Sequence, residues 1–251
     1  MDKESLEKLE HLPTKSRETI VEFTTKVTRA FEENIYSMIL FGSAVGTNFI
    51  EGKSDINTLI ILEKIRMADL EILMEIGEKF SGKGLAVPLL FEKGHVKSSL
   101  DTFPVEFSDM KERHVLLDGE DPLIDTVIEK KNLRYQCEHE FKSILVNLRR
   151  GFLRTAAKRE NIESLLENSL SSVVAACRGM IWLTGQTPPD DSSDLLRLIK
   201  EVYNADTSAI DRVWRLEQGQ SGATALLEAL FEDYSVNIAD LASVADSLQD
   251  Q

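Results

Sequence analysis

The sequence predicts an α+β protein in which a mixed β-sheet with flanking helices, residues 1–125, precedes an all-α helical bundle, residues 126–251. Two observations predict this fold class. Short apolar runs bounded by turn residues, which are typical of buried strands, occur before residue 125. After it, apolar residues recur at helical spacing through long stretches. We therefore expect two domains, with their junction near residues 120–133.

The composition is that of an ordinary globular protein with an acidic balance. The chain has 251 residues and a formal net charge of −14, which argues against a nucleic-acid partner because phosphate neutralisation supplies most of that affinity. No apolar run approaches the roughly 20 residues of a membrane span, and the charged N-terminus lacks the apolar core of a signal peptide. We therefore expect a cytoplasmic protein without a membrane partner, and self-association is left open.

Before residue 125, helical spacing of apolar residues predicts one helix that ends near Glu33 and a second over residues 69–80. Contiguous apolar runs predict buried strands, and a third strand is expected at residues 85–91. Pro88 lies inside that third run and predicts an edge position or a bulge, because proline cannot donate a hydrogen bond to a neighbouring strand. The other strand candidates are residues 37–41 and 58–62, with weaker ones at 104–107 and 115–117.

Beyond residue 125 the pattern is helical throughout. We expect Asn161 to cap the start of one helix and Gly185 to end it, since these residue types favour those positions. Cys137 and Cys177 lie in helical, apolar surroundings without metal-ligand spacing, which predicts buried thiols rather than a zinc site or a disulfide. The expected helices cover residues 131–158, 161–184, 192–204, 206–218 and 222–248.

Residues that can carry chemistry gather where two predicted strands meet their turns. The first strand ends in Gly42-Ser43, where backbone amides and a hydroxyl can approach a phosphate closely. The second strand opens with Asp55-Ile56-Asn57, and residues 55 and 57 share one face of a strand. Two carboxylates so placed would hold Mg²⁺, which prefers oxygen ligands and bridges to substrate phosphates.

This arrangement resembles the polymerase-beta-type nucleotidyltransferase superfamily, in particular its bacterial aminoglycoside-adenylyltransferase-like branch. The resemblance rests on Gly42-Ser43 with the nearby Gly46, and on Asp55 at the next strand, and it covers roughly residues 17–120. The helical segment that follows is similar to the accessory domain of bacterial members. The resemblance implies a nucleotidyltransferase-type sheet, and Mg²⁺-dependent transfer of a nucleoside monophosphate from an NTP to a hydroxyl of a small-molecule or protein acceptor.

The resemblance also assigns roles to individual residues. Asp55 would bind the metal, and the catalytic carboxylates would lie near it. The nucleotide would contact Gly42, Ser43, Gly46, Lys53 and Ser54.

Two positions depart from the superfamily pattern. Asn57 stands where a second metal-binding carboxylate is implied, and its amide oxygen is neutral. A third carboxylate is implied on the strand at residues 85–91, which contains no acidic residue. Glu92 at the end of that strand and Glu106 on the next candidate strand are the residues left to replace it. We therefore take Asp55, Asn57 and Glu106 as the candidate catalytic residues, with Asp55 as the metal ligand.

The missing carboxylates predict a degenerate metal site. The sequence therefore favours a superfamily member whose Mg²⁺-dependent transfer is weakened or lost over an active member with displaced ligands. The alternative is a non-catalytic nucleotide-binding or regulatory scaffold module of the same fold.

Residues 130–159 carry nine basic and two acidic side chains and lie between acidic segments. Arg150, Arg154 and Lys158 share one helix face, because they are four residues apart. This face can attract a triphosphate or an acidic partner. We favour the alternative, a solvated face whose charges pair with neighbouring acidic residues.

Overall fold

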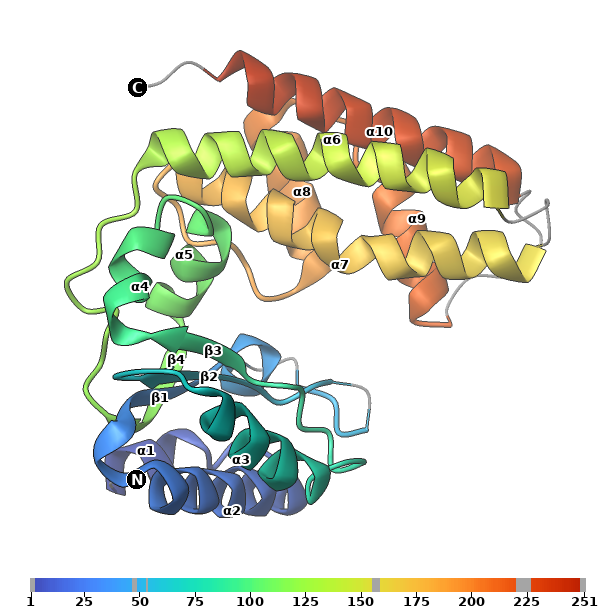
Figure 1. Cartoon of the computed structure of the whole chain (residues 1–251). Coiled ribbons are helices and arrows are strands. Elements are labelled where there is room, and N and C mark those ends of the chain that lie inside the picture. Colours follow the sequence, from blue (N-terminus) through green and yellow to red (C-terminus); the bar gives the residue numbers. More distant parts are fainter. Residues whose placement is uncertain (1–2, 47–48, 53, 155–158, 220–226, 249–251) are drawn as a thin grey trace. The chain divides into compact units, whose positions relative to one another are not determined.

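The computed structural model describes residues 3–46, 49–52, 54–154, 159–219 and 227–248 (Figure 1). The chain divides into two compact units. Unit 1 consists of Met1–Leu100 and Asp109–Val127, and unit 2 consists of Asp101–Ser108 and Ile128–Gln251. Unit 1 contains the β-sheet and unit 2 is helical among its described residues, which confirms the predicted α+β class.

Within its described residues, unit 1 forms a four-stranded mixed sheet with the order β3-β2-β1-β4. β1 (Ile35–Phe41) is antiparallel to both of its neighbours, β2 (Asn57–Leu62) and β4 (His114–Gly119). β3 (Leu89–Glu92) runs parallel to β2 at the edge, as the proline at residue 88 predicted.

The segment that contains Pro88 also has one residue more than the strand beside it. Ile56 bridges to Leu85, whereas Leu59 lies opposite Leu89, so three steps along one strand match four along the other. The extra residue interrupts the third strand, and β3 is therefore shorter than the predicted run of residues 85–91.

Both faces of the sheet are buried, which explains why β1 and β2 are almost continuously apolar. On one face, α2 (Thr14–Phe31) and α3 (Met67–Glu78) cover the sheet (Figure 1). Phe23 of α2 meets Phe80 edge to face in this layer, with ring centroids 5.3 Å apart. The opposite face is buried too, at Ile39, Leu59 and Ile61.

Short helices complete unit 1. α1 (Lys3–Lys8) packs on β4, where the Ser5 hydroxyl donates to the Leu116 carbonyl. The sequence did not predict α1, because six residues are too few to show a period. The remaining short elements are η1 (Glu32–Asn34), η2 (Gly42–Val45) and α4 (Lys93–Ser99).

The strand predicted at residues 104–107 is wrong, because these residues open α5 (Pro104–Glu112). Proline suits the first helical position, where its missing N–H would have no partner anyway. Val105 and Phe107 are both buried although they lie on different sides of a helix. Because this helix packs on two sides, apolar residues occur at alternate positions, as they do in a strand. The prediction of a strand rested on this alternation.

The helices of unit 2 match the predicted ones closely among the described residues. Asn161 is not an N-cap, because it lies inside a helix that begins at Arg159. Gly185 does end that helix with φ +79°, and its N–H donates to the Trp182 carbonyl. Residues 155–158 and 222–226, at the predicted ends of two helices, lie outside the described residues. The helices are α6 (Lys130–Arg154), α7 (Arg159–Leu183), α8 (Ser192–Tyr203), α9 (Ser208–Glu217) and α10 (Leu227–Ser247).

The core of unit 2 lies among α6, α7 and α10, which run alongside one another (Figure 1). Cys137 and Cys177 are fully buried there, as predicted. A Cβ at Gly179 would lie 2.6 Å from the Cys137 sulfur, so glycine permits the close approach of α7 to α6. No described helix is long and apolar enough to cross a membrane.

Gly119 provides a test of how closely β4 and β1 approach. It has φ +81°, and a Cβ there would overlap the carbonyl oxygen of Tyr36. Gly119→Ala should therefore lower the free energy of unfolding by about 3 kcal/mol, measured by urea denaturation. Gly82→Ala is the matched control, since Gly82 has φ +76° but no atom within 4 Å of an added Cβ. It should lose only about 1 kcal/mol, and equal losses would contradict the close approach.

Candidate functional site

The candidate site lies at the end of β1, one of the two internal strands of the sheet. Phe41, its last residue, lies opposite Asn57 of β2 and opposite His114 of β4. The chain then leaves the sheet at Gly42. The residues singled out by the sequence around Gly42 and Asn57 are therefore adjacent in space.

The turn after β1 is anchored on its inner side and open on its outer side. The turn consists of the short 3₁₀ helix η2 (Gly42–Val45). The Gly46 N–H closes this turn by donating to the Ser43 carbonyl at 3.1 Å. Ala44 is fully buried in the core of unit 1. Gly42, by contrast, is exposed, and Ser43 is partly exposed. The outer side of the turn is therefore accessible to a ligand.

Gly42 is required by both its conformation and its contacts. Its φ is +76°, which side chains other than glycine rarely adopt. A Cβ at this position would lie 3.3 Å from the Asn57 side-chain nitrogen. The bare backbone of Gly42 therefore packs against the Asn57 amide, and the structure brings these two predicted site residues together.

Asp55 lies just before β2 and its side chain is exposed. Ile56 is buried and is held in the sheet by hydrogen bonds with Gly84 and Ala86, at 2.7 and 3.1 Å. Because alternate residues of an extended chain face opposite sides, the burial of Ile56 turns Asp55 and Asn57 away from the core. The carboxylate and the amide are thus presented on the same side.

The recorded hydrogen bonds of Ser54 lie within the loop that precedes β2. Its hydroxyl accepts a hydrogen bond from the Ile50 N–H at 3.0 Å, and its N–H donates to the Ile50 carbonyl at 2.8 Å. These bonds close the turn that leads into Asp55. Lys53, which was predicted to contact the nucleotide, lies outside the described residues.

The strand beside β2 supplies no third carboxylate at this end of the sheet. The chain next to Ile56 is the apolar segment Leu85–Val87, and Val87 is 93% exposed. Glu92 lies opposite Leu62, at the far end of β2. Leu62 is five residue steps along the strand from Asn57, or about 17 Å.

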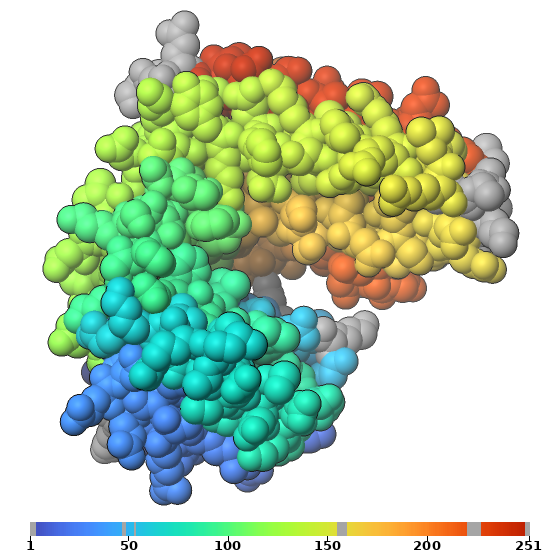
Figure 2. Space-filling view, in the orientation of Figure 1, coloured from blue at the N-terminus to red at the C-terminus, as the bar shows by residue number. Residues whose placement is uncertain are grey.

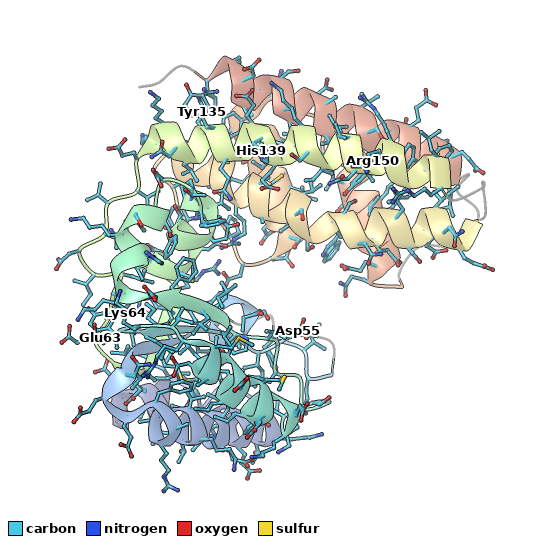
Figure 3. All side chains as sticks on the ribbon, viewed as in Figure 1. Asp55, Glu63, Lys64, Tyr135, His139 and Arg150 are labelled. Atoms are coloured by element: carbon cyan, nitrogen blue, oxygen red, sulfur yellow. The ribbon has the colours of Figure 1, made fainter. Side chains whose placement is uncertain are left out.

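Glu92 is also held in place by other groups. It accepts a hydrogen bond from the Ile65 N–H at 3.0 Å and pairs with Lys64 at 3.3 Å. These two groups, the N–H above all, hold the pKa of Glu92 below its usual value. Figure 3 shows Lys64 and Asp55 at opposite ends of unit 1. Glu92 therefore does not join Asp55.

Glu106 does not lie on a strand, contrary to expectation. It lies on α5, in the part of that helix that belongs to unit 2, and is exposed. Its carboxylate accepts a hydrogen bond from the Gln136 side chain at 2.8 Å, and the same Gln136 accepts from the Val105 N–H at 2.7 Å. Asp55 belongs to unit 1, so the structure does not gather the two carboxylates within one unit.

The donor set does not fit a two-ion magnesium site. No group of three or more His, Cys, Asp or Glu side chains among the described residues is arranged to hold a metal ion. Of the acidic residues predicted for the site, unit 1 places Asp55 beside the neutral amide of Asn57, and Glu92 lies at the far end of β2. Mg²⁺ pairs in phosphoryl-transfer sites need shared carboxylate ligands.

One histidine side chain contacts the turn after β1, a contact that sequence reasoning missed, and a second histidine is the strand partner of Phe41. The His11 Nε2 atom lies 3.2 Å from the carbonyl oxygen of Ala44, inside the turn. His114 lies opposite Phe41, and its Nε2 atom is 2.9 Å from a carboxylate oxygen of Asp121. His11 and Ala44 are 33 positions apart in the sequence, so local spacing carries no signal of their contact.

A surface groove of about 590 Å³ lies along α6 in unit 2, and none of the predicted site residues lines it. Its lining includes Tyr135, His139 and Val146, and α6 is exposed along its length in Figure 2. The groove is shallow and shares no residue with the end of β1. We therefore do not place the chemistry there.

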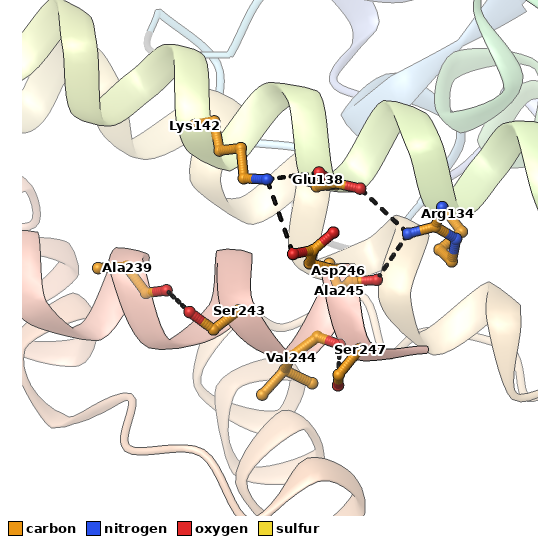
Figure 4. Close-up of polar contacts among 9 residues, drawn as sticks. All are labelled: Arg134, Glu138, Lys142, Ala239, Ser243, Val244, Ala245, Asp246 and Ser247. Carbon is orange, nitrogen blue, oxygen red and sulfur yellow. Dashed lines mark hydrogen bonds and ion pairs between the residues drawn. The ribbon is translucent and has the colours of Figure 1, made fainter. Parts of the chain in front are cut away.

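The basic segment of α6 is partly neutralised by ion pairs. Glu138 pairs with Lys142 and with Arg134, and Lys142 also lies 3.9 Å from Asp246 of α10 (Figure 4). Lys142, more than Arg134, lowers the pKa of Glu138. Asp246 belongs to the acidic segment that follows, so one pair links the two segments; for the face at residues 150–158, pairing with the flanking acidic segments stays a prediction. Of the predicted basic face, Arg150 is exposed (Figure 3), and Lys158 lies outside the described residues.

Comparison with known proteins identifies the fold. No family model and no curated protein sequence matches the chain. A solved structure of spectinomycin adenyltransferase AAD(9) from Enterococcus faecialis, with ATP and spectinomycin, is similar with a TM-score of 0.58. It is 12% identical, and the match covers 91% of this chain and 98% of that chain. The chain therefore has an α+β fold similar to that of this adenyltransferase structure.

Burial excludes the two cysteines as nucleophiles. It raises the pKa of Cys177 to about 12 and raises that of Cys137 still further above its usual value. Both thiols therefore stay protonated at neutral pH, and the thiolate is the reactive form. We expect neither to react with Ellman's reagent at about pH 8 in the native protein, and both to react in denaturant. An exposed thiol from Ser247→Cys is the control, and rapid labelling of the native wild type would contradict the burial.

Proposed function

We propose that this chain binds a nucleoside triphosphate at the turn after β1 and transfers its nucleoside monophosphate to a hydroxyl acceptor, with weakened activity. The observation that carries the proposal is the packing of Gly42, with φ +76°, against Asn57 at the start of β2. The site would serve a cytoplasmic protein. ATP is the donor to test first, because the similar adenyltransferase structure holds ATP.

The turn is suited to phosphate in three respects. Gly42 has no side chain, so a phosphate can approach its backbone closely. Ser43 adds a hydroxyl and a backbone N–H, and the Gly46 N–H closes the far end of the turn by donating to the Ser43 carbonyl. The buried Ala44 holds the turn in place, so little further ordering is needed when the ligand binds.

Transfer is proposed to be weak because the site lacks carboxylates that would bind the metal ions. Phosphoryl transfer depends on positioning and on neutralising the charge of the triphosphate. Asp55 lies two residues before Asn57, whereas Glu92 lies at the far end of β2. The residues present do not fit a pair of Mg²⁺ ions, so we assign no chemical step to the metal. Asp55 remains the one residue that we propose as a metal ligand.

The acceptor is proposed to be a hydroxyl of a small molecule or a protein. The similar structure contains spectinomycin, which makes this compound the first acceptor to test. If spectinomycin is not modified, other compounds with hydroxyl groups are the next acceptors to test.

A second candidate function is a nucleotide-binding module without catalysis. The commitment of Glu92 to Ile65 and Lys64 favours it, because the nearest acidic residue of the third strand is unavailable for chemistry. The same turn would then hold the nucleotide for regulation rather than for turnover.

Asn57→Asp separates the two functions. The change adds a charge with almost no change of shape, beside Asp55 and on the same side of the strand. We expect Mg²⁺-dependent pyrophosphate release from ATP, with spectinomycin or another hydroxyl acceptor, to rise by about tenfold or more. Asp55→Ala in the same background should abolish that gain, and Asp240→Asn, an exposed aspartate of α10, should not.

Two other outcomes decide against the transferase. ATP binding without any pyrophosphate release, in the wild type and in Asn57→Asp, would establish the non-catalytic module. Failure of both proteins to bind ATP would contradict both functions.

A further inference from the structure

Two neighbouring helices of unit 2 carry opposite charges. α6 has seven basic and two acidic side chains, whereas α10 has five acidic side chains and no basic one over Leu227–Ser247. Within the chain, an ion pair between these helices joins Lys142 to Asp246 at 3.9 Å (Figure 4). Between described residues, no ion pair involves Arg149 of α6 or Glu232 of α10, and both side chains are exposed. Opposite charges on the two helices therefore remain available to a partner.

The contacts between α6 and α10 show that the two helices are antiparallel. Near the start of α6, the Arg134 side chain donates to the Ala245 carbonyl near the end of α10, at 3.1 Å. Near the end of α6, the Phe152 ring lies 4.7 Å from the Phe231 ring, which is close to the start of α10. The order of the residues along one helix is therefore the reverse of the order along the other.

These two contacts also fix which residues lie at the same level along the helices. Equal numbers of residues span equal lengths in two α-helices. Arg149 therefore lies at about the level of Glu232, and Val146 lies at about the level of Val236. A basic residue thus stands level with an acidic one, and an apolar residue stands level with another apolar residue.

Apolar side chains are exposed on the same outer surface. Tyr135 and Val146 are about half exposed, and Leu153 is 83% exposed, which is unusual for a leucine. Spacings of 11 and 7 residues place these three on one face of α6. Val236 of α10 is 53% exposed, and the shallow groove of about 590 Å³ lies along this side of α6. Exposed apolar residues bordered by charged ones are typical of an interaction surface.

We propose that two copies of this chain associate through the outer faces of α6 and α10, about a two-fold axis parallel to the helices. This axis lays α6 of each copy on α10 of the other and keeps every residue at its level. Arg149 of one copy then meets Glu232 of the second copy, and Val146 meets Val236. Each contact occurs twice, and the symmetry closes the assembly at a dimer. The inference goes beyond the proposed function, because it uses no residue of the candidate site.

Charge complementarity favours a second copy over other partners. A polyanion such as a nucleic acid would be attracted by α6 but repelled by α10 beside it. A basic partner would be attracted by α10 and repelled by α6. A second copy offers an acidic helix to the basic one and a basic helix to the acidic one, at matching levels, so both contacts are favourable.

The two helices are held together before any partner binds. Glu138 pairs with Arg134 at 3.0 Å and also with Lys142, which lies 3.9 Å from Asp246 (Figure 4). The Arg134 side chain also binds the backbone of α10. The proposed face is therefore ordered in the single chain, and association needs little further ordering.

Sedimentation equilibrium of the full chain tests the proposal. We expect the wild type to form a dimer in the micromolar range at about 50 mM NaCl. The dissociation constant should rise about tenfold at about 500 mM NaCl, because salt screens exposed ion pairs.

Charge reversal tests which residues make the contact. Arg149→Glu and Glu232→Arg, each alone, should raise the dissociation constant about a hundredfold, because each dimer then contains two contacts between like charges. Lys200→Glu, a change of an exposed lysine on α8, is the matched control and should leave the dimer intact. Arg149 and Glu232 are exposed, so we expect both variants to fold, which thermal unfolding followed by circular dichroism checks.

Mixing the two variants tests the two-fold arrangement itself. In a mixed dimer, the introduced glutamate meets the introduced arginine, and the unchanged Arg149 meets the unchanged Glu232. An equimolar mixture should therefore dimerise about as well as the wild type. A variant that had merely lost its fold would not recover in this way.

Four results would overturn the proposal. They are a wild type that stays monomeric in low salt, a dimer that persists in both charge-reversal variants, a mixture that stays monomeric, and assemblies that grow beyond the dimer as the concentration rises. The last result would indicate an open, head-to-tail contact rather than a two-fold one.

Discussion

The candidate site depends on one constraint, the pairing of Phe41 on both sides at the end of β1. This pairing fixes where Asn57 and His114 lie, and it leaves the next residue, Gly42, to turn out of the sheet with positive φ. Ala44 then returns to the core. Because three strands meet at this point, the turn has a fixed position without any contact from a ligand.

Acidic residues are abundant in this chain but scarce where phosphate chemistry would use them. The sequence has 43 acidic residues, yet of the acidic site residues that it predicts in unit 1, Asp55 alone lies next to the start of β2. Glu92 binds a backbone N–H at the far end of the sheet, and Glu138 balances Arg134 and Lys142 on α6. The net charge therefore says little about the site, and the two places without a carboxylate say more.

The sequence was sufficient for the sheet, because residues 37–41 and 58–62 are buried on both faces and read as contiguous apolar runs. It was also sufficient to predict that Gly42 and Asn57 lie close together, because they flank neighbouring strands. It failed at residues 104–107, where packing around the start of a helix imitates a strand. The contact of His11 with Ala44 could not be predicted, because it joins segments 33 residues apart that meet only after the sheet has formed.

A crystal structure with Mg²⁺ and a non-hydrolysable ATP analogue tests the central claim most directly. The account predicts that the triphosphate lies against Gly42 and Ser43, and that Asp55 is the one carboxylate within the metal-ligand distance of about 2.1 Å. A triphosphate bound elsewhere, or a second carboxylate such as Glu106 at that distance, would contradict it.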